Sequence, residues 1–120
     1  MSPPRNDHVD IAGIDVTSAH REIYPGTGIT KADVAQYYAT IAPHLLADIG
    51  GRLLSIVLCP DGIGGDHFFQ KHHATALGAD VHAVPIEEKG GQVDDYLYVD
   101  DVRGLVELAQ MNTIELHAWG

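Results

Sequence analysis

Residues 30–49 read TKADVAQYYATIAPHLLADI, and this stretch decides how the middle of the chain folds. Thr30 and Asp33 stand three residues apart, which is the spacing of a helix-capping box. Apolar residues then recur at helical spacing, at Val34, Tyr38, Ile41, Leu45 and Ile49. Pro43 interrupts this pattern. We therefore expect a break or kink just before it, and a second short helix that ends ahead of Gly50.

Outward from this helix the chain alternates short strand patterns with turn residues. The run LLSIVLC at 53–59 predicts a buried strand, and further strands are expected around 9–16, 68–72, 81–86, 96–99 and 113–119. Gly90-Gly91 predicts a hairpin, and Asp100 or Asp101 is expected to cap a second helix. The predicted fold is α+β, a small mixed or antiparallel sheet with two to three helices. Residues 1–8 are expected to form a flexible tail and 9–120 a single domain.

Composition excludes several classes of protein. A chain of 120 residues with 45% hydrophobic content can bury a core without cross-links. Its single cysteine, Cys59, excludes an internal disulfide and favours a reducing, cytoplasmic setting. No apolar run reaches the roughly 20 residues of a membrane span. Seven basic against 17 acidic residues give a net charge of −10, which argues against a broad basic surface for nucleic acid.

The segment GTGITK at 26–31 partly resembles a phosphate-binding loop. It lacks the Gly-Lys-Ser/Thr ending of the triphosphate pattern. A glycine-containing loop before a helix nevertheless leaves backbone N–H groups free for an anion, and Lys31 and Arg21 would add positive charge. The alternative is an ordinary capped helix with two solvated cations, and these residues taken alone favour that simpler interpretation.

Histidines and acids gather in one segment, as His67, His72 and His73 with Asp61 and Asp66. They are the densest set of possible metal ligands in the chain. None of their spacings fits a zinc site, in which three or four ligands converge. No metal site is predicted.

Phe68 and Phe69 are neighbours in a predicted strand. Adjacent strand residues point to opposite faces, so one ring is expected to face solvent, on the same side as Lys31. An exposed ring of this kind can stack on a nucleobase. The alternative is that neighbouring elements cover both rings.

A series of motifs in this sequence resembles the primase-polymerase domain of bacterial ATP-dependent DNA ligase D. The motifs are REIYP (21–25), GITKAD (28–33), YY (37–38), APHLL (42–46), GR (51–52), CPDGIGG (59–65), FFQK (68–71) and ELHAW (115–119). The similarity runs from about residue 9 to residue 120. It implies the fold of the N-terminal part of that domain, which belongs to the archaeo-eukaryotic primase-polymerase superfamily and serves non-homologous end joining.

The resemblance assigns roles to particular residues. It implies that Arg21 and Lys31 hold the 5′-phosphate of a DNA strand at a gap or break. Ser18 stands where the family often has asparagine and belongs to the same site. Phe68 and Phe69 are expected to pack against DNA near the templating base, and His117 and Lys71 to lie near the active centre. The hairpin around residues 90–91 corresponds to a loop that aligns two DNA ends.

The resemblance also implies partners and limits. DNA with 5′-phosphate ends, Ku and the rest of ligase D are the expected partners, in the bacterial cytoplasm at the nucleoid. The family's polymerase uses manganese or magnesium held by an Asp-x-Asp pair and a later Asp, downstream of the Leu-His-x-Trp motif. The chain stops at Gly120, so we expect it to bind DNA ends without adding nucleotides and to hold no cofactor itself. The alternative is a truncated, non-catalytic paralogue or structural subunit that completes its fold with a partner.

Overall fold

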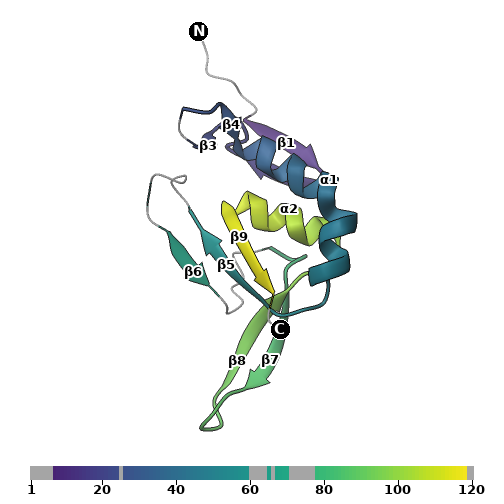
Figure 1. The fold of residues 1–120 in the computed structure, drawn as a ribbon, viewed down its shortest axis with the longest axis vertical. Coiled ribbons are helices and arrows are strands. Elements are labelled where there is room, and N and C mark those ends of the chain that lie inside the picture. The colour runs from purple at the N-terminus through teal and green to yellow at the C-terminus, as the bar shows by residue number, and fades with distance from the viewer. Residues whose placement is uncertain (1–6, 25, 60–64, 66, 71–77, 119–120) are drawn as a thin grey trace.

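The computed structural model describes residues 7–24, 26–59, 65, 67–70 and 78–118. In chain order its elements are β1 (His8–Ile11), β2 (Ile14–Thr17), β3 (Glu22–Tyr24), β4 (Ile29–Thr30), α1 (Lys31–Ile49), β5 (Leu54–Leu58), β6 (Phe68–Gln70), β7 (His82–Glu87), β8 (Val93–Tyr98), α2 (Val102–Gln110) and β9 (Thr113–Ala118). Two helices with antiparallel strand pairs confirm the predicted α+β fold (Figure 1). No helix in these ranges is both long and apolar enough to cross a membrane.

Strand β5 lies at the centre of the largest sheet, as its apolar sequence predicts. It pairs antiparallel with β6 and β9, so that Val57 lies opposite both Phe69 and Glu115. Strand β8 meets β5 at Leu97 and Leu54, both fully buried, and pairs along its length with β7. The β7–β8 hairpin is therefore anchored in the core at one end. Its other end projects away from the body of the molecule (Figure 1).

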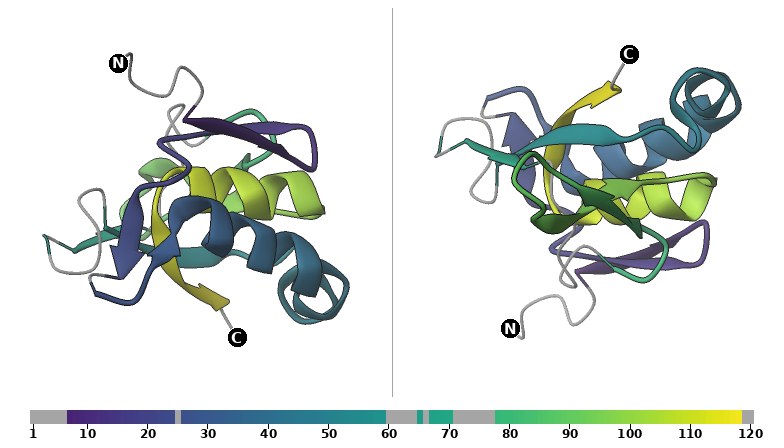
Figure 2. Two further views of the ribbon diagram at one scale, coloured as in Figure 1. Left: turned by 90° about the horizontal axis from the view of Figure 1, so that it is seen from above. Right: turned by 90° about the horizontal axis from the view of Figure 1, so that it is seen from below.

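The two helices pack against each other next to this sheet (Figure 1). Figure 2 shows α2 lying between the β1–β2 hairpin and the large sheet. The buried side of α2 consists of Gly104, Leu105, Val106, Leu108 and Ala109. From α1, the Tyr38 hydroxyl donates a hydrogen bond to the Thr113 carbonyl of β9, 3.1 Å away. Burial raises the pKa of Tyr38 to about 12, so this hydroxyl stays a donor at neutral pH.

Helix α1 corrects one expectation and confirms another. Its capping box forms as predicted, since the Thr30 side chain accepts from the Asp33 N–H and the Asp33 side chain accepts from the Thr30 N–H. The helix does not break at Pro43 but continues to Ile49. Figures 1 and 2 show its axis changing direction along its length, as expected where a proline removes one hydrogen bond and crowds the preceding turn. Burial of Ala42 and Ile49 on either side of Pro43 keeps the helix together across the bend.

The N-terminal hairpin includes the end of the segment that was expected to be a tail. Residues 1–8 were expected to form that tail, yet β1 begins at His8 and Asp7 is held by hydrogen bonds, so residues 7 and 8 belong to the folded part. The turn between β1 and β2 has positive φ at both Ala12 (54°) and Gly13 (84°), the geometry of a two-residue hairpin turn. Val16 of this hairpin is completely buried, because β2 packs on α2.

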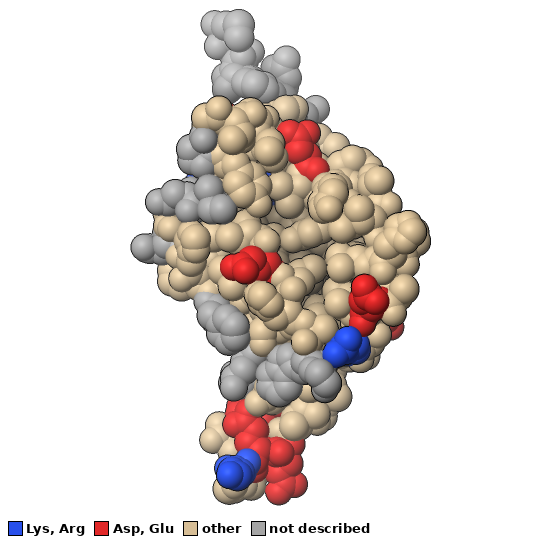
Figure 3. Space-filling model, in the orientation of Figure 1, with Lys and Arg blue, Asp and Glu red and all other residues tan. Residues whose placement is uncertain are grey.

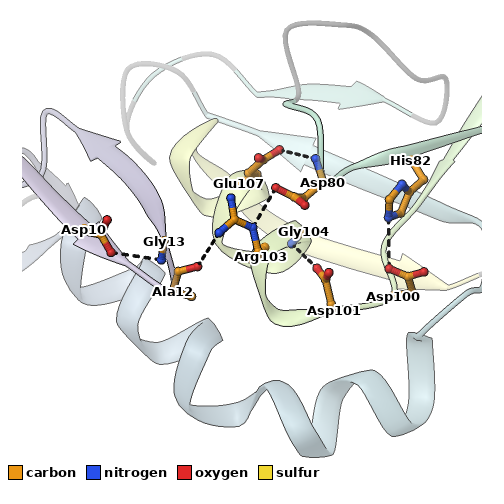
Figure 4. A network of polar contacts seen from close by, with 10 residues as sticks. All are labelled: Asp10, Ala12, Gly13, Asp80, His82, Asp100, Asp101, Arg103, Gly104 and Glu107. Atoms are coloured by element: carbon orange, nitrogen blue, oxygen red, sulfur yellow. Dashed lines mark hydrogen bonds and ion pairs between the residues drawn. The ribbon is translucent and has the colours of Figure 1, made fainter.

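A polar network fastens two loops onto α2 (Figure 4). The Arg103 guanidinium donates to the Asp80 carboxylate at 3.2 Å and to the Ala12 carbonyl at 3.3 Å. The Glu107 carboxylate accepts from the Asp80 backbone N–H at 3.1 Å. Partial burial, together with the neighbouring Asp80 carboxylate, raises the pKa of Glu107. Arg103 thus ties the β1–β2 turn and the loop before β7 to one helix.

The remaining predicted elements are found with small shifts in their bounds. Asp101, one of the two candidate caps, starts α2 by accepting from the Gly104 N–H at 3.0 Å. Gly104 is needed there, because an added Cβ would lie 2.7 Å from both the Asp80 carbonyl oxygen and the Val99 side chain. The predicted hairpin at 90–91 is confirmed, and both glycines have positive φ. Trp119 lies outside the described residues.

Candidate functional site

A tight turn at residues 18–21 lies against the first turn of α1. The Arg21 carbonyl accepts from the Lys31 N–H at 2.8 Å, and the Ala19 carbonyl accepts from the Ala32 N–H at 2.9 Å. Within the turn, the Arg21 N–H donates to the Ser18 carbonyl at 3.0 Å, and Ser18 has a positive φ of 50°. The structure therefore brings together the three residues that the sequence grouped in one site, namely Ser18, Arg21 and Lys31. We call the turn 18–21 and Lys31 the cationic corner.

The backbone N–H groups at the start of α1 are not free for an anion, which corrects the sequence interpretation. The first two donate to carbonyls of the turn, and the third, from Asp33, donates to the Thr30 hydroxyl at 3.2 Å. In the preceding loop the Thr27 N–H donates to the Tyr24 carbonyl at 3.1 Å. A helix start attracts anions through such unsatisfied donors. An anion at this corner would therefore have to be bound by side chains rather than by these backbone groups.

Lys31 is the unusual member of the corner, because only 5% of it is exposed. Burial and then the positive charge of Arg21 lower its pKa, while Asp7 acts in the opposite direction. Among the described residues, no carboxylate forms an ion pair with its ammonium group. Buried charges in proteins are ordinarily paired. Two neighbouring cations, one of them buried with no ion pair to any described residue, form a site suited to a small anion with two negative charges.

Asp7 borders this corner and contacts His20 within it. One Asp7 carboxylate oxygen accepts from the His20 backbone N–H at 2.8 Å and lies 2.7 Å from the His20 Nδ1. These two hydrogen bonds lower the pKa of Asp7. The Asp7 carbonyl also accepts from the Ala19 N–H at 2.9 Å. The sequence analysis missed both residues, since Asp7 falls in a segment that reads as a tail.

The aromatic prediction is confirmed in part. Phe68 begins β6 opposite Leu58, and 52% of it is exposed, so the pair does present a ring to solvent. The side chain of Phe69 lies outside what the structure describes, as does the whole of Lys71. The orientation of the exposed ring relative to Lys31 stays a prediction.

His117 lies on β9, opposite Ser55 of the central strand. Its side chain is 58% exposed and forms an ion pair with Glu115 on the same strand at 3.4 Å. The two residues are two positions apart, so they share one face of the sheet. His117 is thus accessible and held by an acidic neighbour, and its place near an active centre stays a prediction.

An open groove beside α1 was not anticipated. It has a volume of about 490 Å³ and is lined by Tyr24, Ile29, Asp33, Val34, Tyr37, Tyr38 and Ile114. Most of its lining is apolar or aromatic, and Tyr37 is 60% exposed. The tyrosine pair at 37–38 was the only sign in the sequence, and helical periodicity there indicates just one buried tyrosine. The groove can accept a flat apolar group.

In the part of the chain described here, no three His, Cys, Asp or Glu side chains come together in a way that could hold a metal ion. Of the five residues in the histidine-rich segment, only His67 is described; Asp61, Asp66, His72 and His73 lie outside.

Charge is distributed unevenly over the surface. Figure 3 shows a face with few charged side chains over most of the body and a concentration of acids on the projecting hairpin. That hairpin carries Glu87, Glu88, Asp94 and Asp95 with only Lys89 between them. On the face drawn in Figure 3, the described residues form no broad basic surface.

Comparisons with known proteins agree with these features. A sequence model of the family described as "LigD, primase-polymerase domain" matches residues 30–120. The chain is 36% identical, over 109 residues, to "Multifunctional non-homologous end joining protein LigD" of Pseudomonas aeruginosa, covering 90% of this chain and 13% of that protein. It is 31% identical over 104 residues to the protein of the same name from Mycobacterium bovis, covering 87% of this chain and 14% of that protein. The chain thus spans about one seventh of the length of these relatives.

The fold has a solved counterpart. The chain superimposes with a TM-score of 0.79 and 30% sequence identity on "Polymerase Domain from Mycobacterium tuberculosis Ligase D in complex with DNA". The match covers 88% of this chain and 36% of the solved chain.

Proposed function

The chain belongs to the LigD primase-polymerase family, and on that premise we propose that it recognises DNA ends through the 5′-phosphate at a gap or break. The ligand is a phosphate monoester on a DNA strand, and the cationic corner is its site. The process it serves is non-homologous end joining, which gives the similar LigD proteins their name. Ku and the remaining parts of a ligase D are the partners we propose.

The burial of Lys31 is the observation that carries this proposal. A lysine that is 5% exposed, next to Arg21 and without an ion pair among the described residues, carries a charge that is energetically unfavourable until an anion neutralises it. A terminal phosphate carries close to two negative charges at neutral pH and has three acceptor oxygens. It would match the point charge of Lys31 and the planar guanidinium of Arg21 together.

The exposed Phe68 supports a nucleic-acid ligand over free phosphate. A nucleobase stacked on an exposed aromatic ring contributes about 1–3 kcal/mol. Because the chain carries a net charge of −10, a general electrostatic attraction to DNA is not available to it. We therefore propose that binding depends on one phosphate and one ring, with a weak dependence on DNA length.

We also propose that the 120-residue chain binds DNA without extending it. The family's Asp-x-Asp metal pair has no counterpart in this sequence. Phosphoryl transfer by two metal ions requires carboxylates on one side of the site. Primed gapped DNA with manganese and nucleotides tests this directly, and extension by the purified chain would contradict it.

Binding of gapped DNA with a 5′-phosphate and the same DNA with a 5′-hydroxyl tests the main proposal, using fluorescence anisotropy. The phosphate is expected to improve affinity by about 1–3 kcal/mol, roughly 5- to 150-fold. Lys31→Met should remove this preference, while Lys89→Met at the hairpin should leave it unchanged. Equal binding of the two DNAs by the unmodified chain would contradict the phosphate site and favour a purely structural role.

A further inference from the structure

The cationic corner is held in shape by a residue outside it. The turn 18–21 contacts α1 through two of its carbonyls, from Ala19 and Arg21. The turn also contacts Asp7, which accepts one hydrogen bond through its carbonyl and two through its carboxylate. The turn is thus bonded both to α1 and to the residue that precedes β1.

We propose that Asp7 is a positioning residue for the phosphate site: its carboxylate holds His20, and through His20 it fixes Arg21 beside Lys31. This inference rests on the proposed function of the corner. His20 lies directly before Arg21, so the hydrogen bond from the His20 N–H to Asp7 restrains the backbone that carries the guanidinium. Loss of that bond would free the turn at the point where Ser18 has a positive φ, a conformation that is costly for a residue other than glycine.

The negative charge of Asp7 should weaken the binding of an anion at the corner, while its hydrogen bonds should strengthen that binding by holding the turn in place. A carboxylate near Lys31 partly neutralises the corner, as its opposing effect on the pKa of Lys31 indicates. The same carboxylate organises the turn. The two effects are separable, because an asparagine keeps an acceptor oxygen for the His20 N–H but carries no charge.

The surroundings provide a matched control. Asp15 forms a similar pair with His8, whose Nδ1 lies 3.0 Å from the Asp15 carboxylate. That pair is exposed, on the β1–β2 hairpin, and Asp15 is one of the hairpin's strand residues. Asp15→Ala therefore removes a similar His–Asp contact without touching the turn at 18–21.

The test compares Asp7→Ala, Asp7→Asn and Asp15→Ala by their preference for phosphorylated over unphosphorylated gapped DNA. Asp7→Ala is expected to lower the preference by about fivefold or more. Asp7→Asn is expected to retain or raise it, and Asp15→Ala to leave it unchanged. An unchanged preference in Asp7→Ala, or an equal rise in both Asp7 variants, would overturn the positioning role, since the second result would mean that only charge matters.

Amide hydrogen exchange separates this inference from the proposed function. In Asp7→Ala, exchange should accelerate at His20, Lys31 and Ala32, whose N–H groups depend on the turn, and in Asp7→Asn it should stay slow. If the unmodified chain shows no phosphate preference but exchange responds in this way, the proposed ligand is wrong and Asp7 still positions the turn. If exchange at these amides is the same in all variants, the positioning role itself is wrong.

Discussion

The cationic corner and the β7–β8 hairpin differ in how far their charged side chains are buried. In the corner, a lysine that is 5% exposed is kept beside an arginine by hydrogen bonds of the surrounding backbone. On the hairpin, four acids are spread over strands that project into solvent (Figure 3). The first arrangement costs stability and the second costs little, because water solvates exposed carboxylates. A costly charge that the fold maintains indicates a ligand, whereas a solvated one does not.

The comparison also explains how an acidic protein can bind an acidic polymer. The molecule extends 58 Å along its longest axis, and exposed charges are screened beyond roughly 8–10 Å in physiological salt. The hairpin's acids should therefore weaken the proposed binding of DNA at the corner only modestly. The net charge of −10 describes the whole chain and does not describe the site.

The largest loss of stability is expected from a substitution where the β7–β8 hairpin joins the core. Leu97→Ala removes a fully buried side chain at the contact between β8 and β5, and should lower the free energy of unfolding by about 2–5 kcal/mol. Urea denaturation measures it. The matched control is Val93→Ala near the tip, where the side chain is 59% exposed and the change should stay within about 0.5 kcal/mol. Similar losses at both positions would mean that the hairpin packs along its whole length.

A smaller loss of stability is expected from a substitution at the start of α1, which supports the cationic corner. Thr30→Ala removes one half of the capping box, and should cost about 1 kcal/mol of stability. Thr40→Ala is the control, because the Thr40 hydroxyl bonds only to Gln36 on an exposed face of the same helix, donating to its carbonyl and accepting from its side-chain amide. That variant should be neutral or slightly stabilising, since alanine is the better helix former. A loss at Thr40 equal to that at Thr30 would show that the cap contributes nothing of its own.

The sequence predicted those features that depend on local patterns. The capping box at Thr30, the buried strand at 53–59 and the cap at Asp101 follow from residue spacing and side-chain chemistry, and the structure confirms all three. The loop before the helix already suggested Arg21 and Lys31 as neighbouring cations, the resemblance to a family gave them a role, and the structure does bring the two residues together.

The features that the sequence could not predict depend on contacts between distant segments. Whether the N–H groups at the start of α1 are free depends on where the turn at 18–21 lies, which no local pattern specifies. The continuation of α1 through Pro43 similarly depends on tertiary packing, which offsets the roughly 3 kcal/mol that an internal proline costs. Asp7 was overlooked because a polar segment next to two prolines reads as a tail.

Removing negative charges from the β7–β8 hairpin should change the free energy of DNA binding. This change should be smaller than the changes that Leu97→Ala and Thr30→Ala cause in the free energy of unfolding. Glu87→Gln with Asp94→Asn and Asp95→Asn removes three negative charges and keeps Glu88, whose carboxylate accepts from the Tyr96 hydroxyl. Affinity for phosphorylated and unphosphorylated DNA should rise together by about two- to fivefold at low salt, and the gain should vanish at high salt. The ratio of the two affinities should not change. A changed ratio would place the hairpin in the phosphate site.

The smallest effect on stability at neutral pH is expected from Lys31→Met. This variant tests the energetics of the cationic corner most directly. Burial and Arg21 lower the pKa of Lys31 in the folded state, so in the alkaline range below about 10.4 the unfolded chain binds this proton more tightly. The contribution of Lys31 to stability is therefore unfavourable at pH 7 and becomes less so as the pH rises through its folded pKa. Lys31→Met should be at least as stable as the unmodified chain at pH 7, and that advantage should shrink as the pH rises toward the ordinary lysine pKa of about 10.4. Urea denaturation across this range measures the difference, with Lys89→Met at the exposed hairpin as the control that shows no such trend. A variant clearly less stable at pH 7 would mean that Lys31 is a structural residue with a partner of its own, and the energetic argument for a bound anion would fail.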